Sequence, residues 1–198
     1  MTGDRGREQQ TLDLIAAAVR AGVELIQIRE RGFDDRVLSR LARRAVDISR
    51  GSASRIIVND RADVALATGA SGVHLRGNSF AAARVRALAP PGFLIGRSVH
   101  TVSEATAAEA SGECDYLMFG TVFPSASKLS THTIAGLDAL RAVCGAVRLP
   151  VLAIGGISIE NVRPVAEAGA SGIAGISVFE TADSPSAIVS SLRRQFDT

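Results

Sequence analysis

Tryptophan is absent from this 198-residue chain, and aromatic residues make up only 4% of it. Because proteins that hold single-stranded nucleic acid stack its bases on aromatic side chains, this composition argues against that function. The hydrophobic residues, 46% of the chain, are mainly Ala, Val, Ile and Leu. That mixture is typical of buried parallel strands covered by helices, and the length predicts a single domain over residues 1–198.

An excess of one charge sign is also missing, since 22 basic and 20 acidic residues give a formal net charge of only +2. The two signs are mixed along the chain, which argues against nucleic acid and membrane surfaces as partners. No apolar run approaches the roughly 18 residues that span a bilayer, and the polar N-terminus lacks a signal-peptide pattern. Cys114 and Cys144 have neither metal-binding nor disulfide spacing, so a reducing, cytoplasmic location is predicted.

Apolar runs of strand length alternate with helical repeats of Ala, Leu and Arg. Strands are predicted at about residues 23–28, 55–59, 72–75, 94–99, 115–119, 150–154 and 172–177. Helices are predicted at about residues 8–21, 35–49, 60–69, 79–89, 102–112, 135–147, 158–169 and 186–196. This alternation predicts an α/β fold, a (β/α)8 TIM barrel.

The first predicted helix has no strand before it, so the barrel is expected to lack or truncate its first strand. Residues 1–7 are too polar and Gly-rich to form a buried parallel strand. We therefore expect residues 1–5 to belong to the loop after the missing strand, and the true start codon to lie upstream.

Two apolar runs late in the chain end in Gly or Ser, the first at Gly155-Gly156 and the second at Ser177, after Ile176. TIM barrels commonly bind phosphate after their seventh and eighth strands, where glycines and helix N-termini expose backbone N–H groups. The pair of runs therefore predicts a phosphorylated small-molecule ligand. A tight turn alone would also explain Gly155-Gly156.

Polar side chains follow several of the other predicted strands. Alternation places Gln27, Arg29 and Arg31 on one face, which suits a pyrophosphate, although a solvated cluster with Glu30 fits as well. The next strand ends in Asn59-Asp60. Asp60 would either bind Mg²⁺ or cap the following helix.

Further candidates come from the middle of the chain. His74 would act in the site or pack beneath it, and the hydroxyl of Ser98 would face the same opening as Arg29. The long irregular stretch at residues 120–133 is expected to cover or build the site, since long loops in compact domains often do. Its Lys128 would clamp an anion or be an ordinary surface lysine.

Helix capping is predicted after the first of the two late runs. Ser158 and Asn161 lie where the next helix begins, and both residue types favour the N-cap position.

In order, the segments QIRER, IIVNDRADVAL, ASGVHL, IGRSVHTVSEA, DYLMFGTVFPSASK, LPVLAIGGIS and GIAGIS resemble the thiamine phosphate synthase and TenI superfamily, from about residue 22 to residue 177. The resemblance implies a TIM barrel that joins hydroxymethylpyrimidine pyrophosphate to thiazole phosphate. Pyrophosphate leaves, and the thiazole nitrogen captures the resulting carbocation. Such a reaction needs positioning, Mg²⁺ and charge stabilisation, and no protein nucleophile.

The resemblance also assigns roles by position. The pyrophosphate contacts are Gln27, Arg29, Arg31, Asn59, Ser98 and Lys128, of which Arg29, Ser98 and Lys128 are the predicted catalytic residues. Asp60 matches a Mg²⁺ ligand. The thiazole phosphate contacts are Ser125, Ser127, Gly155, Gly156, Ile176 and Ser177.

Four departures from the family pattern bear on activity, and one of them is the missing first strand, which removes part of the barrel wall. Arg31 stands where the synthase has Lys, which keeps the charge and changes its geometry. The second Mg²⁺ ligand of the synthase is an Asp, and Ser79 replaces it beside the extra cation Arg76, which should weaken Mg²⁺ binding. Thr121 stands where TenI-type tautomerases have a catalytic His.

Three functions remain open on the sequence alone: a synthase-like transferase, a metal-free thiazole tautomerase of the TenI type, and a non-catalytic binder of thiamine-related phosphates. Dependence on Mg²⁺ separates the first two. The predicted partners are small phosphorylated substrates, and a homodimer is an open alternative to a monomer.

Overall fold

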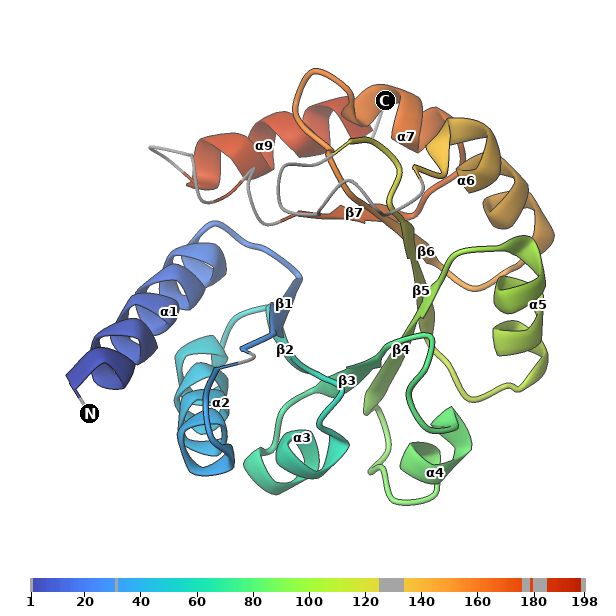
Figure 1. Ribbon diagram of the computed structural model, residues 1–198. Helices are drawn as coiled ribbons and strands as arrows, with labels where there is room; N and C mark the ends of the chain where they lie inside the picture. The colour runs from blue at the N-terminus through green and yellow to red at the C-terminus, as the bar shows by residue number, and fades with distance from the viewer. Residues whose placement is uncertain (1, 31, 125–133, 176–178, 180–184, 197–198) are drawn as a thin grey trace.

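Seven parallel strands form one sheet in which strands adjacent in sequence are also adjacent in space, in the order β1-β2-β3-β4-β5-β6-β7. The computed structural model describes residues 2–30, 32–124, 134–175, 179 and 185–196. The sheet curls, and the helices lie on its outer side (Figure 1). Among the described residues β1 pairs only with β2 and β7 only with β6, so the barrel is open between these two strands.

The strands lie close to the predicted positions, which confirms the predicted fold class, and no strand precedes residue 25 in the part of the chain that the structure describes. They are β1 (Leu25–Ile28), β2 (Arg55–Asn59), β3 (Gly72–Leu75), β4 (Leu94–Val99), β5 (Tyr116–Gly120), β6 (Val151–Ile154) and β7 (Gly172–Ala174). The helices are α1 (Thr2–Arg20), α2 (Asp35–Ser49), α3 (Ala62–Thr68), α4 (Ala82–Arg86), α5 (Val102–Ala110), α6 (Gly136–Ala146), α7 (Val162–Glu167) and α9 (Pro185–Phe196).

Helix α1 begins at Thr2, so the expectation that residues 1–5 form a loop is wrong for residues 2–5. The helix is anchored farther along, where Leu12 and Ile15 are buried and the buried Glu8 accepts two hydrogen bonds from Arg40 of α2. Once a helix is nucleated, each further residue adds a backbone hydrogen bond at little extra cost. The polar first residues therefore extend the helix.

Helices α1 and α9 complete the outer layer on either side of the opening (Figure 1). Helix α1 contacts α2 on one side and α9 on the other. Arg193 of α9 also donates a hydrogen bond to the carbonyl oxygen of Gly22, at 2.7 Å, in the turn before β1. The last helix is thus joined to the first helix and the first strand.

The two faces of the sheet have different chemistry, because successive strand residues point to opposite sides. The outer face packs on the helices through a hydrophobic core that includes Val58, Val73 and Leu117, all fully buried. The inner face carries polar groups among apolar ones. His74 and Tyr116 are both buried there, at 2% and 6% exposure.

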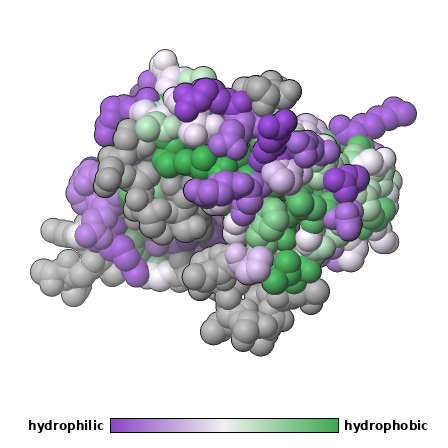
Figure 2. Space-filling view, turned by 90° about the horizontal axis from the view of Figure 1, so that it is seen from above, coloured by the Kyte–Doolittle hydropathy of each residue, from purple (hydrophilic) through white to green (hydrophobic). Residues whose placement is uncertain are grey.

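The face of the protein seen from above is mixed in hydropathy. Seen from above, hydrophilic side chains are interspersed with apolar ones (Figure 2). Within the described ranges, no helix combines the length and the apolar character that a membrane span requires.

Glycine at position 96 creates the room for Tyr116. In the sheet register His74 lies opposite Gly96, which lies opposite Tyr116. A Cβ atom at position 96 would lie 2.0 Å from Cζ of the Tyr116 ring, which is far inside van der Waals contact.

Replacing Gly96 should therefore destabilise the barrel interior. We expect Gly96→Ala to lower the free energy of unfolding by about 1–3 kcal/mol, because the added methyl group overpacks the site. Urea denaturation followed by circular dichroism measures this change. Gly145→Ala is the matched control, since no atom lies within 4 Å of its added Cβ, and it should leave stability unchanged or slightly higher. Equal stability of the two variants would contradict the packing argument.

Candidate active site

The carboxyl ends of all seven strands lie at one edge of the sheet, because every strand pair is parallel. At this edge the side chain of Gln27, from β1, donates a hydrogen bond of 2.8 Å to the amide oxygen of Asn59, from β2. The two amides are partly buried and fix one another in position. The structure thus brings together two residues predicted to bind the pyrophosphate.

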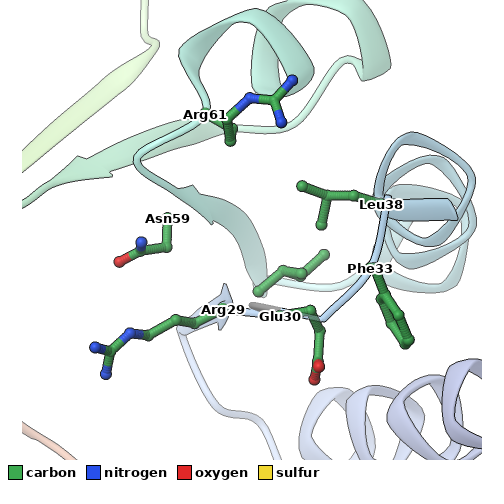
Figure 3. A pocket seen from close by; sticks show the side chains of 7 residues that line it. Arg29, Glu30, Phe33, Leu38, Asn59 and Arg61 are labelled. Carbon is green, nitrogen blue, oxygen red and sulfur yellow. The ribbon is translucent and has the colours of Figure 1, made fainter. Parts of the chain in front are cut away.

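A pocket of about 190 Å³ opens beside this amide pair. Its lining residues come from the end of β1, the end of β2 and the start of α2: Ile28, Arg29, Glu30, Phe33, Leu38, Asn59 and Arg61. Figure 3 shows Arg29 and Asn59 extending to the same side, with Glu30 directed elsewhere. The pyrophosphate role of this face stays a prediction, beside the alternative of a solvated cluster with Glu30.

Arg61, on the far wall of the pocket, has a structural role. It donates two hydrogen bonds to Asp63, at 2.9 and 2.7 Å, and a further one to Asp35 of α2. These contacts hold the loop after β2 against α2. They also hold Asn59 in place, since it lies two residues before Arg61.

Asp60 is bound by the loop that follows β3. One carboxylate oxygen, Oδ1, accepts a hydrogen bond from the hydroxyl of Ser79, and Oδ2 accepts two from the guanidinium of Arg76, the one from Nε at 2.8 Å. Partial burial acts to raise the pKa of Asp60, but the bonds from Ser79 and Arg76 outweigh it and hold this pKa below its usual range.

The alternative role of Asp60 as a helix cap is wrong. The N-cap position of α3 belongs to Arg61, and no side chain caps that helix. The reason is local backbone geometry, because Asp60 has a φ of +60° and its carboxylate is directed toward the loop after β3.

Magnesium is the metal that the family resemblance implies at Asp60, and the described residues do not fit it well. Mg²⁺ requires near-ideal octahedral oxygen ligands. Both oxygens of Asp60 already accept hydrogen bonds, and a cationic side chain occupies one of them. Across residues 2–30, 32–124, 134–175, 179 and 185–196 there is no group of three or more His, Cys, Asp or Glu that could hold a metal ion.

A buried polar chain runs beneath the strand ends. Nε2 of His74 lies 2.8 Å from the hydroxyl of Ser98, and Nδ1 lies 3.2 Å from the hydroxyl of Tyr116. The rings of His74 and Tyr116 are stacked, with centroids 5.7 Å apart. His74 is thus both packed beneath the site and linked to it, so the two alternatives of the sequence analysis are combined.

Burial lowers the pKa of His74 to about 4, and the positive charge of Arg29 adds to this effect while Asp60 opposes it. The imidazole is therefore neutral near pH 7, with one donor and one acceptor nitrogen. When Nδ1 accepts from Tyr116, Nε2 donates to Ser98 and leaves the Ser98 hydroxyl hydrogen to point at a ligand. Burial raises the pKa of Tyr116, which keeps its phenol protonated and able to donate.

The Gly155-Gly156 turn lies against the loop that follows β5. Both glycines have positive φ, +106° and +61°, and an added Cβ would lie 2.4 Å from Thr121 Cγ2 at position 155 and 2.2 Å from the Pro124 carbonyl oxygen at position 156. Only glycine fits this close approach. The loop after β5 is aligned by hydrogen bonds from Val122 N–H to the Ile154 carbonyl and from Phe123 N–H to the Gly155 carbonyl, both 3.0 Å.

Asn161 stabilises this turn from the other side. Its amide nitrogen donates to the carbonyl oxygen of Gly156 at 2.9 Å, and its amide oxygen accepts from the backbone N–H of Ser158 at 2.8 Å. Asn161 occupies the N-cap position of α7, but its side chain makes no capping bond. The predicted capping role is therefore wrong for Asn161, because its amide is committed to the glycine turn.

Six of the predicted site residues lie outside the described part of the chain: Arg31, Ser125, Ser127, Lys128, Ile176 and Ser177. Their roles stay predictions.

Tyr116 is the functional candidate that the sequence analysis missed. Alternation along residues 115–119 would have placed it on the same face as Met118, and the small residue Gly96 on the neighbouring strand was the available signal.

The comparisons with known proteins agree with this geometry. A family model described as thiamine monophosphate synthase matches residues 1–179. The chain belongs to this family. The resemblance noted in the sequence motifs is thereby confirmed.

Similar proteins carry the same name. A thiamine-phosphate synthase of Chlorobium luteolum is 41% identical over 187 residues, covering 94% of this chain and 88% of that protein. One of Methanoculleus marisnigri is 40% identical over 188 residues, covering 95% and 89%. A solved thiamine phosphate pyrophosphorylase from Pyrococcus furiosus superposes with a TM-score of 0.83 at 33% identity, covering 94% of this chain and 89% of that one.

The neutral state of His74 predicts a pH dependence of stability. As the pH falls through 6.5 the unfolded chain takes up a proton at this residue, whereas the folded chain does so only near pH 4. The contribution of His74 is therefore complete above pH 6.5 and declines between 6.5 and 4, by about 2 kcal/mol at pH 5. Urea denaturation at pH 7.5 and pH 5 measures it. His74→Gln, which has no titrating ring, should lose less stability over this interval, and equal losses would contradict a neutral His74.

Proposed function

We propose that this chain is a transferase that joins hydroxymethylpyrimidine pyrophosphate to thiazole phosphate, giving thiamine phosphate and pyrophosphate in thiamine biosynthesis. The observation that carries the proposal is the family match over residues 1–179, with thiamine-phosphate synthases 41% and 40% identical among the relatives. The grouping of Arg29 with the Gln27–Asn59 pair at the strand ends supports it.

The pyrophosphate end of the first substrate would bind at the ends of β1, β2 and β4. Arg29 would supply charge-assisted hydrogen bonds, Asn59 an amide, and Ser98 a hydroxyl oriented by the neutral His74. As the carbon–oxygen bond breaks, negative charge develops on the leaving group. Fixed donors that already point at this position stabilise that charge without reorganising, which lowers the barrier. Lys128 and Arg31 are proposed as further cations on the same group.

The thiazole phosphate would bind at the Gly155-Gly156 turn. The assignment rests on the family resemblance and on the place of this turn after β6, at the carboxyl edge of the sheet; the contacts of both glycines with the loop after β5 also fit a tight turn. Ser125, Ser127, Ile176 and Ser177 are the proposed partners around it. Two anion sites on opposite sides of one strand edge would place the thiazole nitrogen against the pyrimidine carbon, which is catalysis by positioning.

The family resemblance implies Mg²⁺ beside Asp60, where it would neutralise charge on the leaving pyrophosphate, but the described residues there do not fit it. The bonds from Arg76 and Ser79 to the Asp60 carboxylate compete with it, in line with the weakened site expected from Ser79.

The tautomerase alternative has less support. At the position of the TenI-type catalytic His this chain has Thr121, which is 6% exposed and carries no group that titrates near neutral pH. Only a measurement of product formation distinguishes the non-catalytic binder from the transferase. A homodimer stays a prediction that light scattering would test.

Direct product analysis tests the proposed activity. We expect the purified protein to form thiamine phosphate and pyrophosphate when both substrates are present, and neither product when one is omitted, as measured by chromatography. Binding of thiazole phosphate without product formation would contradict the transferase and favour the binder.

Two variants test the division into two anion sites. Arg29→Ala and Lys128→Ala should each lower kcat by about 10²–10³, because each removes a donor to the leaving group. Both should leave the Kd for thiazole phosphate, measured by calorimetry, within about twofold. Arg163→Ala is the control, since Arg163 is an exposed arginine paired with Glu167 on α7, and it should change neither value. Loss of thiazole phosphate binding in either site variant would show that the assignment of the two sites is wrong.

A further inference from the structure

The loop after β3 contacts Asp60, just beyond the end of β2, through Arg76 and Ser79. The guanidinium of Arg76 donates from both Nε and Nη2 to one oxygen of Asp60, while the hydroxyl of Ser79 binds the other oxygen. Ser79 also accepts from the backbone N–H of Arg76 at 2.9 Å. The loop thus has one hydrogen bond within itself and others to the Asp60 carboxylate.

This arrangement places a cation where a metal ion would otherwise compensate Asp60. The side chain of Asp60 is 20% exposed, and that of Arg76, which is bonded to it, is 51% exposed. A divalent cation added at the same oxygen would meet the positive charge of Arg76 at close range, and the hydroxyl of Ser79 brings no charge to offset that repulsion.

The same guanidinium is bonded to the residue next to a predicted pyrophosphate contact. Asp60 directly follows Asn59, and its backbone N–H donates to the carbonyl oxygen of His74 at 2.8 Å, two residues before Arg76. His74 in turn contacts Ser98, and its pKa responds to the charges of both Arg29 and Asp60. The ends of β2, β3 and β4 therefore bring Arg76 into the neighbourhood of the donors proposed for the leaving group.

Arg76 has capacity for a further anion. A guanidinium carries five N–H donors in a fixed plane, and the contact with Asp60 engages Nε and Nη2. Pairing of the other edge with a phosphate oxygen would be a charge-assisted bond of the kind arginine commonly makes.

We propose that Arg76, oriented by Asp60 and Ser79, takes the place of the divalent cation as the counter-charge for the pyrophosphate group, so that this chain binds pyrophosphate without magnesium. The proposal rests on the proposed function for the position of the pyrophosphate. Asp60 is then a positioning residue for Arg76, and Arg76 touches the substrate.

Calorimetry with inorganic pyrophosphate tests the proposal, in EDTA and in excess Mg²⁺. We expect the wild-type Kd to differ by less than about threefold between the two conditions, and Arg76→Ala to weaken binding in EDTA by about tenfold to a hundredfold, the value of a charge-assisted hydrogen bond. Arg76→Lys keeps the positive charge and loses the planar guanidinium. Its Kd in EDTA should lie between those of the wild type and Arg76→Ala. A wild-type Kd that improves tenfold or more with Mg²⁺ would overturn the proposal.

A matched control separates a binding role from a purely structural one. Arg97 holds the same loop by donating to the carbonyl oxygens of Gly77, at 3.0 Å, and Phe80, at 3.5 Å. Arg97→Ala should therefore loosen the loop, seen as a lower melting temperature, and leave pyrophosphate affinity within about threefold. If Arg97→Ala weakens pyrophosphate binding as much as Arg76→Ala does, loop order and not the guanidinium is responsible, and the proposal is wrong.

The double variant Arg76→Ala/Ser79→Asp removes the cation and adds a second carboxylate beside Asp60. We expect it to bind pyrophosphate tightly only with Mg²⁺, with at least a tenfold gain over EDTA. No gain in pyrophosphate affinity with Mg²⁺ would contradict the proposal that Arg76 replaces the metal ion. Failure of the proposed function would give a different result. No thiamine phosphate would form when both substrates are supplied, while the pyrophosphate titrations would still give the affinities described above.

Discussion

Parallel pairing of all seven strands is the constraint on which the rest of the structure depends. It brings every strand's carboxyl end to one edge, so that residues 24 and 32 positions apart in sequence become neighbours. Gln27 meets Asn59 there at 2.8 Å, and His74 meets Ser98 at the same distance. The hydrophobic layer between the outer face and the helices fixes the register, because a slip of one residue would turn the buried side chains inward.

Polar side chains can be buried on the inner face of the sheet because they form hydrogen bonds with one another. Tyr116, His74 and Ser98 form one chain of contacts, and Gly96 leaves the room that the tyrosine ring needs. Burial keeps the imidazole neutral, so it orients the serine hydroxyl without contributing charge. Positive charge at the strand ends is left to the arginines. This division suits a reaction in which the protein holds an anionic leaving group and supplies no nucleophile.

Two loop contacts distinguish the two proposed anion sites. On one side, Arg76 and Ser79 close onto Asp60, which converts an expected metal position into one occupied by a fixed organic cation. On the other side, the glycine turn at Gly155-Gly156 packs against the loop after β5. The first contact depends on charge, and the second depends on the absence of a Cβ.

Strand positions, the open barrel and the family could all be predicted from the sequence, because buried parallel strands and their motifs are encoded in short contiguous runs. The start of α1 was not, since its buried anchor, Glu8 with Arg40, comes from two helices. The sequence also identified the loss of a carboxylate at Ser79. Only the tertiary structure decided what Asp60 and Asn161 bind, because a side chain's partner depends on which loops the sheet register brings beside it, and that is a property of the whole fold.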